Sequence, residues 1–401
     1  MKTTNKLLGL AAVAALMAAA PAMAQDVKLG FLADLTGPIA GFAPGMVTAG
    51  NLAIQNINDQ GGVLAGGKLS SVVADTLCDG SGGGPGGDRM VNTEKVTAIF
   101  GAYCSGPVIS AANTAAIPGN VVMITPSGTA PAISDLADND LVFRNVVPDS
   151  EQGVKMAQLL ISKGIKTVGV TYVNGDYGKG LSDAFAAAYT AAGGTIAANV
   201  AHEDGKSDYR PEIGQIEAAG ADTLVILGYE NAGGGTILNQ AIETGSFKQF
   251  VGGDGMAGEA LVTSREAAGL EGMILTRAAP AGGPAYDAFT AVAKAGNIDP
   301  AGVYVTNSYD SVFLLALAIE KNGSADRAGV SKALREVANA PGEVILPGEW
   351  KKAVELIKAG TDINYQGASG EIEFDDKGDV KGAIQNFVIQ GGKIVDQGLI
   401  P

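Results

Sequence analysis

The chain has 401 residues, which is long enough for two domains, and a formal net charge of −15. So acidic a chain repels nucleic acid and anionic membrane surfaces, and we expect neither as a partner. It contains one histidine, His202, and two cysteines. A single histidine does not build a zinc site or a Ser-His-Asp triad, so we expect a structural His202, no metal and no enzymatic activity.

Residues 1–24 have the pattern of a cleavable export signal. Lys2 and Lys6 precede an apolar run over residues 7–20, which is too short to span a bilayer. Ala22-Met23-Ala24 then forms a small-x-small cleavage motif, and the next residue, Gln25, has no thiol for a lipid anchor. We therefore expect a soluble periplasmic protein. Its charge is near −17, because −15 loses the two lysines of the signal.

Export also decides how the two cysteines are interpreted. In an oxidising compartment an even pair, here Cys78 and Cys104, indicates a disulfide rather than a metal or redox site. ATP and NAD are scarce outside the cytoplasm, so we expect no cofactor. No later segment reaches the ~18 consecutive apolar residues of a membrane span.

Strand-like and helix-like patterns alternate along the rest of the chain. A helix is predicted over 44–58, and residues 181, 184, 185, 188 and 189 recur at the spacing of one helix face. The predicted strands are 27–35, 68–75, 97–102, 121–125, 167–173, 195–202, 223–229, 250–253 and 273–276. Strands separated by helices indicate βαβ units and parallel sheets.

These strands are too many for one sheet, and a break near 145–150 divides them. We therefore predict an α/β protein of two doubly wound lobes joined by a hinge. The first lobe is predicted to comprise 26–145 and 277–383, and the second 146–276 and 384–401. Glu371–Asp375 and Ala383–Ile394 look like an antiparallel ending around a turn at 376–379. The glycine-rich stretch Asp79–Gly87 is expected to be an irregular loop.

Two segments come close to nucleotide-binding motifs. Gly62–Lys68 resembles a P-loop until Leu69, which stands where Ser or Thr should ligate magnesium, and it precedes a strand instead of following one. Gly253–Gly258 fits the dinucleotide pattern, but Asp254 would point a carboxylate at the pyrophosphate. We interpret the first as a turn and reject the second as a cofactor site.

Polar residues gather where the predicted strands end, which is where open α/β sheets bind ligands. Hydroxyls and small residues follow the earlier strands, at Tyr103–Gly106 and Thr125–Thr129, and suit a carboxylate. Two tyrosines and an acid follow the later ones, at Asp176–Gly178, Tyr229-Glu230 and Asp254, and suit an ammonium. Together they predict a site for an α-amino acid.

Motifs in the same regions resemble one family through most of the chain. They are Gly30–Pro38, Asn58–Val63, Gly101–Ser105, Met123–Pro131, Asp176–Gly180, Val251–Asp254 and Phe374–Asp379. With these motifs in this order, the chain resembles the leucine/isoleucine/valine-binding proteins of ABC importers, which are type I periplasmic binding proteins. The resemblance implies two lobes that close on a ligand.

The resemblance also implies roles for individual residues. Ser105 and Thr129 would supply hydroxyls, and Ser127 backbone groups, to the ligand carboxylate. Asp254 would face the ammonium. Tyr177 and Tyr229 would line the second lobe, Phe42 would cover the ligand side chain, and Cys78 and Cys104 would match the family's disulfide.

The chain departs from the family pattern at four places. The glycine run Asp79–Gly87 is unusual there, and the segment Ala340–Gly367, with the single tryptophan Trp350, is longer than expected. Asp254 is one carbon shorter than the family's common glutamate. Glu230 is an extra acid beside Tyr229. It could bind a second amine or an amide of the ligand, but we expect it to face solvent.

The sequence therefore predicts a monomeric solute-binding protein that captures a small neutral, branched-chain or aliphatic amino acid. It would dock on an ABC permease in the inner membrane. Alternatives are the same fold binding an amide, a urea-like compound or an aromatic acid, or a sensor that signals to a membrane partner. An exported hydrolase lacks the required residues.

Overall fold

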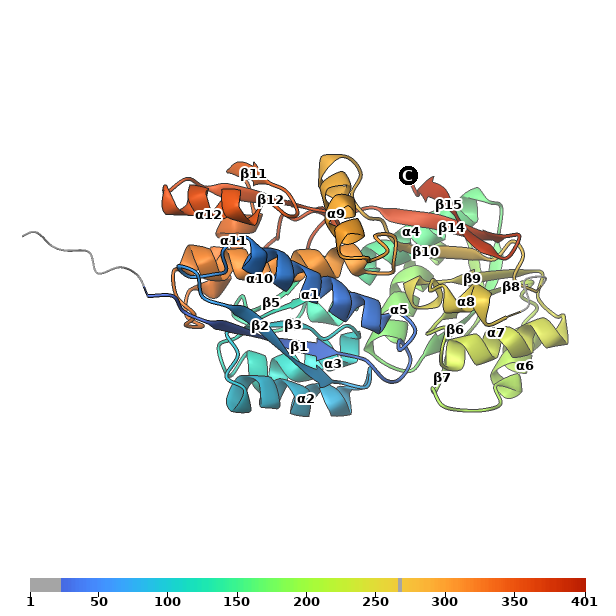
Figure 1. Cartoon of the computed structure of the whole chain (residues 1–401). Helices are drawn as coiled ribbons and strands as arrows, with labels where there is room; N and C mark the ends of the chain where they lie inside the picture. Colours follow the sequence, from blue (N-terminus) through green and yellow to red (C-terminus); the bar gives the residue numbers. More distant parts are fainter. Residues whose placement is uncertain (1–22, 266–268) are drawn as a thin grey trace, which may run out of the picture.

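The computed structural model describes residues 23–265 and 269–401. The two lysines and the apolar run of the predicted export signal lie outside the described residues. None of the helices within the described ranges has the length and apolar character needed to cross a membrane. Figure 1 shows two lobes side by side, each with a central sheet covered by helices.

The first lobe is built on a parallel sheet with strand order β2-β1-β3-β4-β5. Its strands are β1 (Val27–Ala33), β2 (Leu69–Asp75), β3 (Ala98–Gly101), β4 (Val122–Thr125) and β5 (Val142–Arg144). Its helices are α1 (Ala43–Asp59), α2 (Gly80–Asp88), α3 (Ser105–Ala111), α9 (Pro284–Ala295), α10 (Val305–Asn322), α11 (Val330–Ala338) and α12 (Trp350–Lys358). The last four return to this lobe from the far end of the chain (Figure 1).

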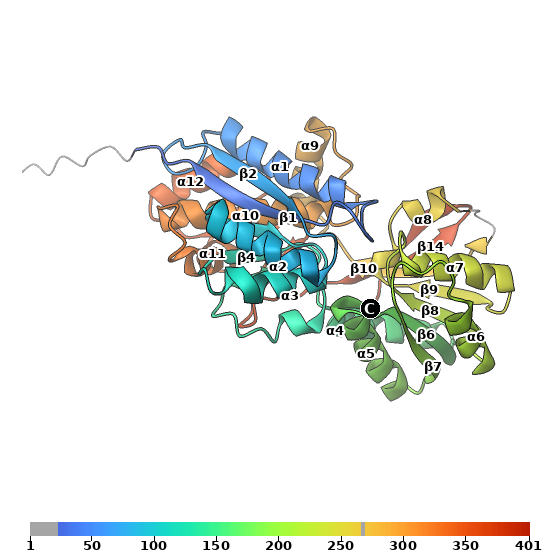
Figure 2. The same ribbon diagram turned by 90° about the horizontal axis from the view of Figure 1, so that it is seen from below.

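Helices cover both faces of this sheet, so both faces are buried. Side chains of successive strand residues point to opposite faces, and each face therefore has its own core. Phe31 and Phe100 pack in an edge-to-face pair in the core under α1 and α10. Their neighbours Leu32 and Ile99 belong to the core on the opposite face, with α3. Figure 2 shows these helices on the two sides of the sheet.

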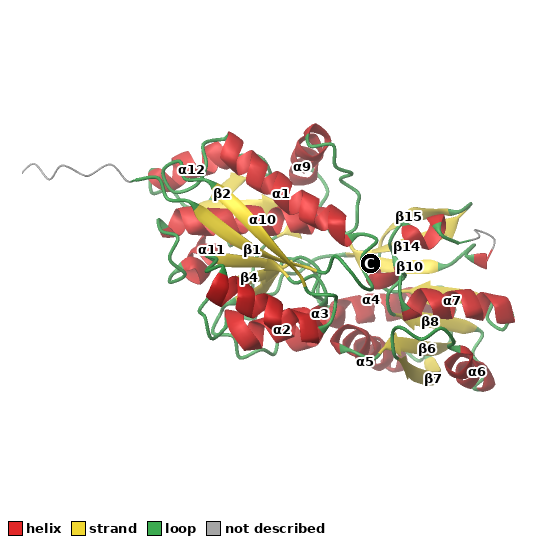
Figure 3. Ribbon diagram, turned by 60° about the horizontal axis from the view of Figure 1, so that its bottom comes forward, coloured by secondary structure: helices red, strands yellow, loops and turns green. Residues whose placement is uncertain are grey.

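The second lobe has a larger, mixed sheet with strand order β15-β14-β10-β9-β8-β6-β7. Its strands are β6 (Thr167–Val173), β7 (Thr195–His202), β8 (Thr223–Leu227), β9 (Gln249–Gly252), β10 (Ile274–Ala278), β14 (Ile384–Gln390) and β15 (Lys393–Leu399). Its helices are α4 (Asp149–Ser162), α5 (Asp176–Ala191), α6 (Arg210–Ala218), α7 (Gly233–Thr244) and α8 (Ala260–Thr263). Figure 3 shows the alternation of helix and strand in both lobes, and the predicted α/β fold of two doubly wound lobes is confirmed.

The antiparallel ending differs from the prediction. β14 pairs with β15, not with the 371–375 segment, because Gly391 and Gly392 both have positive φ and form the two-residue turn between them. Gly370–Glu371 (β13) pairs instead with β12 (Ile363–Gly367), which also pairs with β11 (Glu343–Ile345). The turn at 376–379 exists, but it joins no strand pair.

The glycine-rich stretch Asp79–Gly87 is also not the irregular loop that was predicted. It forms most of α2, whose first turn is capped by the Asp79 carboxylate accepting from the Ser81 amide at 2.7 Å. The absence of side chains lets α2 lie directly on α3. A Cβ on Gly83 would stand 2.5 Å from the Pro107 Cα, so close helix packing outweighs the low helix propensity of glycine.

The long segment Ala340–Gly367 forms α12 and the strands β11 and β12 of the small sheet. Trp350 begins α12 and is fully buried, and its indole donates to the Gly62 carbonyl at 3.0 Å. That carbonyl belongs to the turn that resembled a P-loop. The extra length therefore adds a layer to the first lobe, well away from the second one (Figure 1).

Candidate functional site

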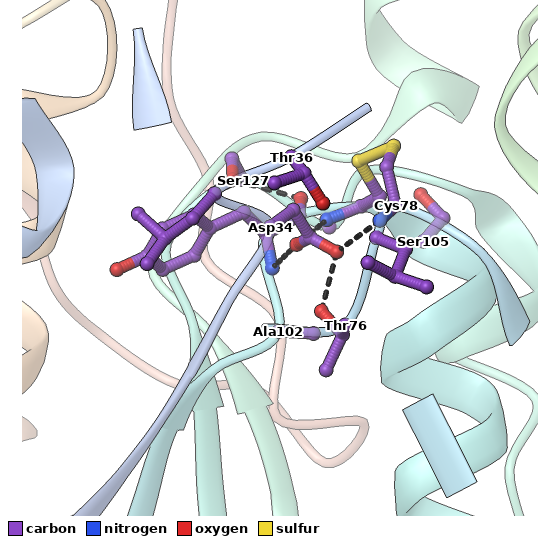
Figure 4. The surroundings of a disulfide bond; sticks show 12 residues. Asp34, Thr36, Thr76, Cys78, Ala102, Ser105 and Ser127 are labelled. Carbon is purple, nitrogen blue, oxygen red and sulfur yellow. Dashed lines mark hydrogen bonds between the residues drawn. A yellow bond between two sulfur atoms is a disulfide. The ribbon is translucent and has the colours of Figure 1, made fainter. Parts of the chain in front are cut away.

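A buried carboxylate organises the edge of the first lobe that faces the second lobe. Asp34 follows β1 and accepts hydrogen bonds from the Cys78 amide at 2.7 Å and the Tyr103 amide at 2.8 Å. The Cys104 amide at 3.1 Å and the Thr76 hydroxyl complete its shell. Figure 4 shows Asp34 between the disulfide and these loops. Burial raises the pKa of Asp34, and these bonds offset part of that rise.

The predicted disulfide between Cys78 and Cys104 is present. It joins the loop after β2 to the loop after β3, and Ser105 follows directly as the first residue of α3. Asp34, Cys78 and Cys104 also place their ligand-type atoms within 4.8 Å of one another, but both sulfurs are used by the disulfide.

Hydroxyl groups tie the loops after β3 and β4 together. The Ser127 hydroxyl donates to the Tyr103 carbonyl at 2.8 Å, and the Ser105 hydroxyl accepts from the Ala130 amide at 3.1 Å. The Thr125 hydroxyl accepts from the Gly128 amide at 2.8 Å. The two predicted carboxylate-binding loops therefore form one rigid unit.

A fully buried arginine holds this unit from behind. Arg144 donates to the carbonyls of Thr129 at 2.9 Å and Ala130 at 3.0 Å. Its guanidinium also makes two bonds to the Asp379 carboxylate, at 2.6 and 3.0 Å. The fork geometry of arginine allows one side chain to serve both partners, and Asp379 comes from the turn at 376–379.

A second buried carboxylate, Asp254, lies opposite on the second lobe. Tyr177 donates to one of its oxygens at 2.8 Å and Gln152 donates to the same oxygen at 3.1 Å. Tyr304, from the first lobe, donates to the other oxygen at 2.6 Å. This last bond crosses the cleft, so the two lobes are in contact. Burial raises the pKa of Asp254, although the three bonds oppose it.

Aromatic rings surround this carboxylate. Tyr177 and Tyr229 stack with ring centroids 5.1 Å apart. The backbone of Gly255 comes so close to them that a Cβ there would lie 2.5 Å from the Gly228 carbonyl and 3.0 Å from Tyr229. This glycine is required by close approach, not by a nucleotide.

Both lobes line a single cavity at this point. The space is about 20 Å³, room for little more than one water molecule. Of the predicted ligand-binding residues, those that line it are Phe42, Ser105, Ser127, Tyr177, Tyr229 and Asp254. Thr129 does not line it, because its segment turns back toward Arg144.

Tyr304, Gln152 and Asp149 also lie at or beside this site and were not predicted. Tyr304 precedes α10 and has a positive φ of 55°. It does not follow a strand, so the pattern of polar residues at strand ends does not include it. Asp149 and Gln152 begin α4 directly after the break that the sequence shows between the lobes. The sequence feature that could have indicated these two site residues is the presence of an acid and an amide in the first helical turn after that break.

Asp149 is unusual because its buried carboxylate has no hydrogen bond of good geometry among the described residues. The residue is fully buried, yet neither carboxylate oxygen has a hydrogen-bond partner among the described residues, and neither does the Thr129 hydroxyl. The Asp149 amide donates to the Thr129 carbonyl at 2.9 Å. Burial raises the pKa of Asp149 well above its ordinary value, and the charge of Asp254 raises it further. The neighbouring Thr129 hydroxyl and the charge of Arg144 oppose this rise in part.

The expectation that Glu230 faces solvent is wrong. Its side chain is buried and accepts from the Leu261 amide at 3.1 Å, near the start of α8. Burial raises its pKa to about 7. A Cβ on Gly258 would lie 2.1 Å from its carboxylate, so the backbone of the second lobe has folded closely around this acid.

His202 is buried at the end of β7, where one ring nitrogen bonds to the Thr171 hydroxyl at 2.8 Å. Burial lowers its pKa to about 4. The ring also meets Tyr209 edge to face at 5.8 Å. These contacts describe a neutral histidine in a core, away from the cavity.

Comparison with known proteins agrees with this geometry. A family model described as "Periplasmic binding protein" matches residues 26–355. A Leu/Ile/Val-binding protein of Rhizobium johnstonii is 32% identical over 82% of this chain and 89% of its own length. A leucine-, isoleucine-, valine-, threonine- and alanine-binding protein of Pseudomonas aeruginosa is 30% identical over 95% of this chain and 94% of its own length.

Among solved structures, a leucine-binding protein of Thermotoga maritima superimposes with a TM-score of 0.80 at 25% identity. The match covers 93% of this chain and 98% of that one. The resemblance found in the sequence motifs is thereby confirmed. The chain belongs to the periplasmic binding protein family, in the group of the Leu/Ile/Val-binding proteins.

Proposed function

We propose that this chain is the extracytoplasmic solute-binding protein of an ABC importer. It captures a small neutral amino acid, of the branched-chain or aliphatic type, between its two lobes. The site works in the periplasm, and the loaded form docks on a permease of the inner membrane. The relatives named as Leu/Ile/Val-binding proteins support this proposal.

One observation carries the proposal: opposite kinds of chemistry face each other across the cavity. The first lobe presents the hydroxyls and backbone of the Ser105 and Ser127 loops, which suit a carboxylate. The second lobe presents Asp254 between tyrosine rings, which suits an ammonium. A zwitterion satisfies both sides at once, and each charge leaves water only when its partner is in place.

The small volume of the cavity implies how the ligand enters. A space of about 20 Å³ does not admit an amino acid, so the lobes separate first. The open form would bind the ligand on one lobe, and closure would add the contacts of the other. Ligand then shifts the population toward the closed form because that form offers more contacts.

Replacing the acid tests this role. Asp254→Asn is expected to weaken binding of leucine, isoleucine and valine at least ~30-fold, since ~2 kcal/mol is lost when a buried ammonium has no countercharge. Isothermal titration calorimetry at neutral pH measures the change. The matched control is Asp183→Asn, an exposed acid on α5 of the same lobe, which should leave affinity unchanged.

A thermal-shift screen separates this proposal from the alternatives. Wild-type protein should be stabilised by the three aliphatic amino acids, by ~2.7 kcal/mol at a hundred times the dissociation constant. A shift with acetamide, urea or benzoate and none with leucine would show that the ligand is an amide, a urea-like compound or an aromatic acid instead of an aliphatic amino acid. Equal affinity of wild type and Asp254→Asn would refute the proposed role of the acid.

A further inference from the structure

A second cavity adjoins the first on the far side of Tyr304. It holds about 310 Å³, which is ligand-sized, and it lies between the loop before α10 and the β10, β14 and β15 strands of the second lobe. Tyr304 lines both cavities. Its hydroxyl reaches Asp254, so this one side chain forms the wall between the two spaces.

An arginine side chain without an ion-pair partner, Arg277, lines this second cavity. The Arg277 guanidinium lies 4.5 Å from the centre of the Phe387 ring. In the described parts of the chain it makes no ion pair within 4.0 Å and no hydrogen bond. Partial burial lowers the pKa of this guanidinium. A half-buried guanidinium in a cavity and without an ion-pair partner favours an anionic ligand.

The other charges near Arg277 stand at the rim of the cavity. Glu259, Asp299 and Asp396 line it and are exposed to solvent. The charges of Glu259 and Asp396 oppose the fall in the Arg277 pKa, and the hydroxyls of Tyr304 and Tyr286 do the same. None of the three acids is within ion-pair distance, so they leave the guanidinium free for a ligand.

The second cavity is also joined to Asp254 by a short chain of contacts. Gln152 donates to Asp254 at 3.1 Å and to the Thr276 carbonyl at 3.3 Å. Arg277 is the next residue of β10. The anion-favouring group and the ammonium-favouring group are therefore fixed relative to each other within the second lobe.

We propose that the second cavity is a subsite for the side-chain carboxylate of an acidic amino acid. The ligand's α-ammonium is held at Asp254 and its distal carboxylate at Arg277, after Tyr304 has moved aside during opening. The subsite rests on the proposed amino-acid function and extends its ligand range beyond neutral side chains.

The test compares glutamate with leucine in calorimetric titrations of the full-length mature protein. Arg277→Gln should weaken glutamate binding at least tenfold and leave leucine within twofold, because only glutamate has the second carboxylate. Arg277→Lys should retain most of the glutamate affinity. The rim variant Asp396→Asn should strengthen glutamate binding, because it removes a repelling charge, and leave leucine unchanged.

These opposite signs distinguish recognition from a structural role, which would move both ligands together. An unchanged glutamate-to-leucine ratio in Arg277→Gln would overturn the subsite, and so would leucine binding without any glutamate binding. Failure of leucine, isoleucine and valine to bind would instead overturn the proposed function. Circular dichroism shows whether each variant is folded, and the exposed Asp396 variant tests the subsite even if Arg277→Gln does not fold.

Discussion

At the scale of single residues, the site combines satisfied and unsatisfied acids. Asp34 accepts four hydrogen bonds and Asp254 three, whereas the Asp149 carboxylate has no hydrogen bond of good geometry within the described part of the chain. An ionised carboxylate without donors is costly inside a protein. Burial therefore favours the protonated form of Asp149 and costs stability whenever its carboxylate is ionised.

Replacing Asp149 should reveal this cost. The folded state raises the pKa of Asp149 above the unfolded value of ~3.9, so folded protein loses stability relative to unfolded as pH rises. Asp149→Asn does not titrate, and should stabilise the ligand-free protein by roughly 1–3 kcal/mol at pH 8. The gain should shrink at pH 5.5. Urea unfolding at the two pH values measures it.

Asp183→Asn again serves as the control, because that carboxylate is exposed to solvent. A pH-independent effect of Asp149→Asn would show that the carboxylate is not the source of the cost.

The sequence predicts the site residues that follow strands, but it does not predict site residues elsewhere in the chain. Ser105, Tyr229 and Asp254 follow strands, and a parallel sheet brings its carboxyl ends together. Tyr304 precedes a helix and approaches the site from the other lobe, so no local pattern marks it. Glu230 does not face solvent as expected, because the chain folds back over this acid at Gly258.

At the scale of elements, α2 shows how tertiary contact can outweigh propensity. Hydrophobic periodicity, which records burial, predicts four of the five strands of the first sheet and five of the seven strands of the second. The missing strand of the first sheet, β5, has only three residues, too few to show a pattern. A run of glycines has no periodicity to read. The α2 helix forms because α3 packs against it so closely that only a hydrogen atom fits in place of a side chain. This contact depends on α3, which lies further along the chain, so the local sequence of α2 does not reveal it.

Gly83→Ala should therefore destabilise the protein by ~1–3 kcal/mol, because its Cβ would stand 2.5 Å from the Pro107 Cα. Gly80→Ala is the matched control in the same helix, since its nearest contact is 3.9 Å away. It should be neutral or stabilising by up to ~1 kcal/mol. Chemical denaturation compares the two. Equal effects would mean that helix packing is not what requires Gly83.

At the scale of the whole molecule, the two lobes meet through small residues as well as through Tyr304. A Cβ on Gly180 in α5 would lie 2.7 Å from the Pro131 ring on the first lobe. Closure therefore requires a residue without a side chain at this position. The division of the chain at 145/146, 276/277 and 383/384 stays a prediction about which parts move together.

A larger residue at this contact should keep the lobes apart. Gly180→Leu is expected to lower amino-acid affinity at least tenfold and to increase the radius of gyration measured with saturating leucine by X-ray scattering. Gly175→Leu is the control, because the backbone there is extended and a Cβ would meet nothing within 4 Å. A closed, tightly binding Gly180→Leu variant would exclude this contact as a condition of closure.

The bond from Tyr304 to Asp254 has a consequence for selectivity. A solute that reaches Asp254 meets a carboxylate that already accepts hydrogen bonds from neutral hydroxyls and an amide of the protein itself. These groups act as a built-in competitor. A neutral donor would exchange one uncharged bond for another and gain little, whereas an ammonium would add charge attraction in a site shielded from bulk water. Under the proposed function, this arrangement would favour solutes that carry an ammonium over uncharged ones.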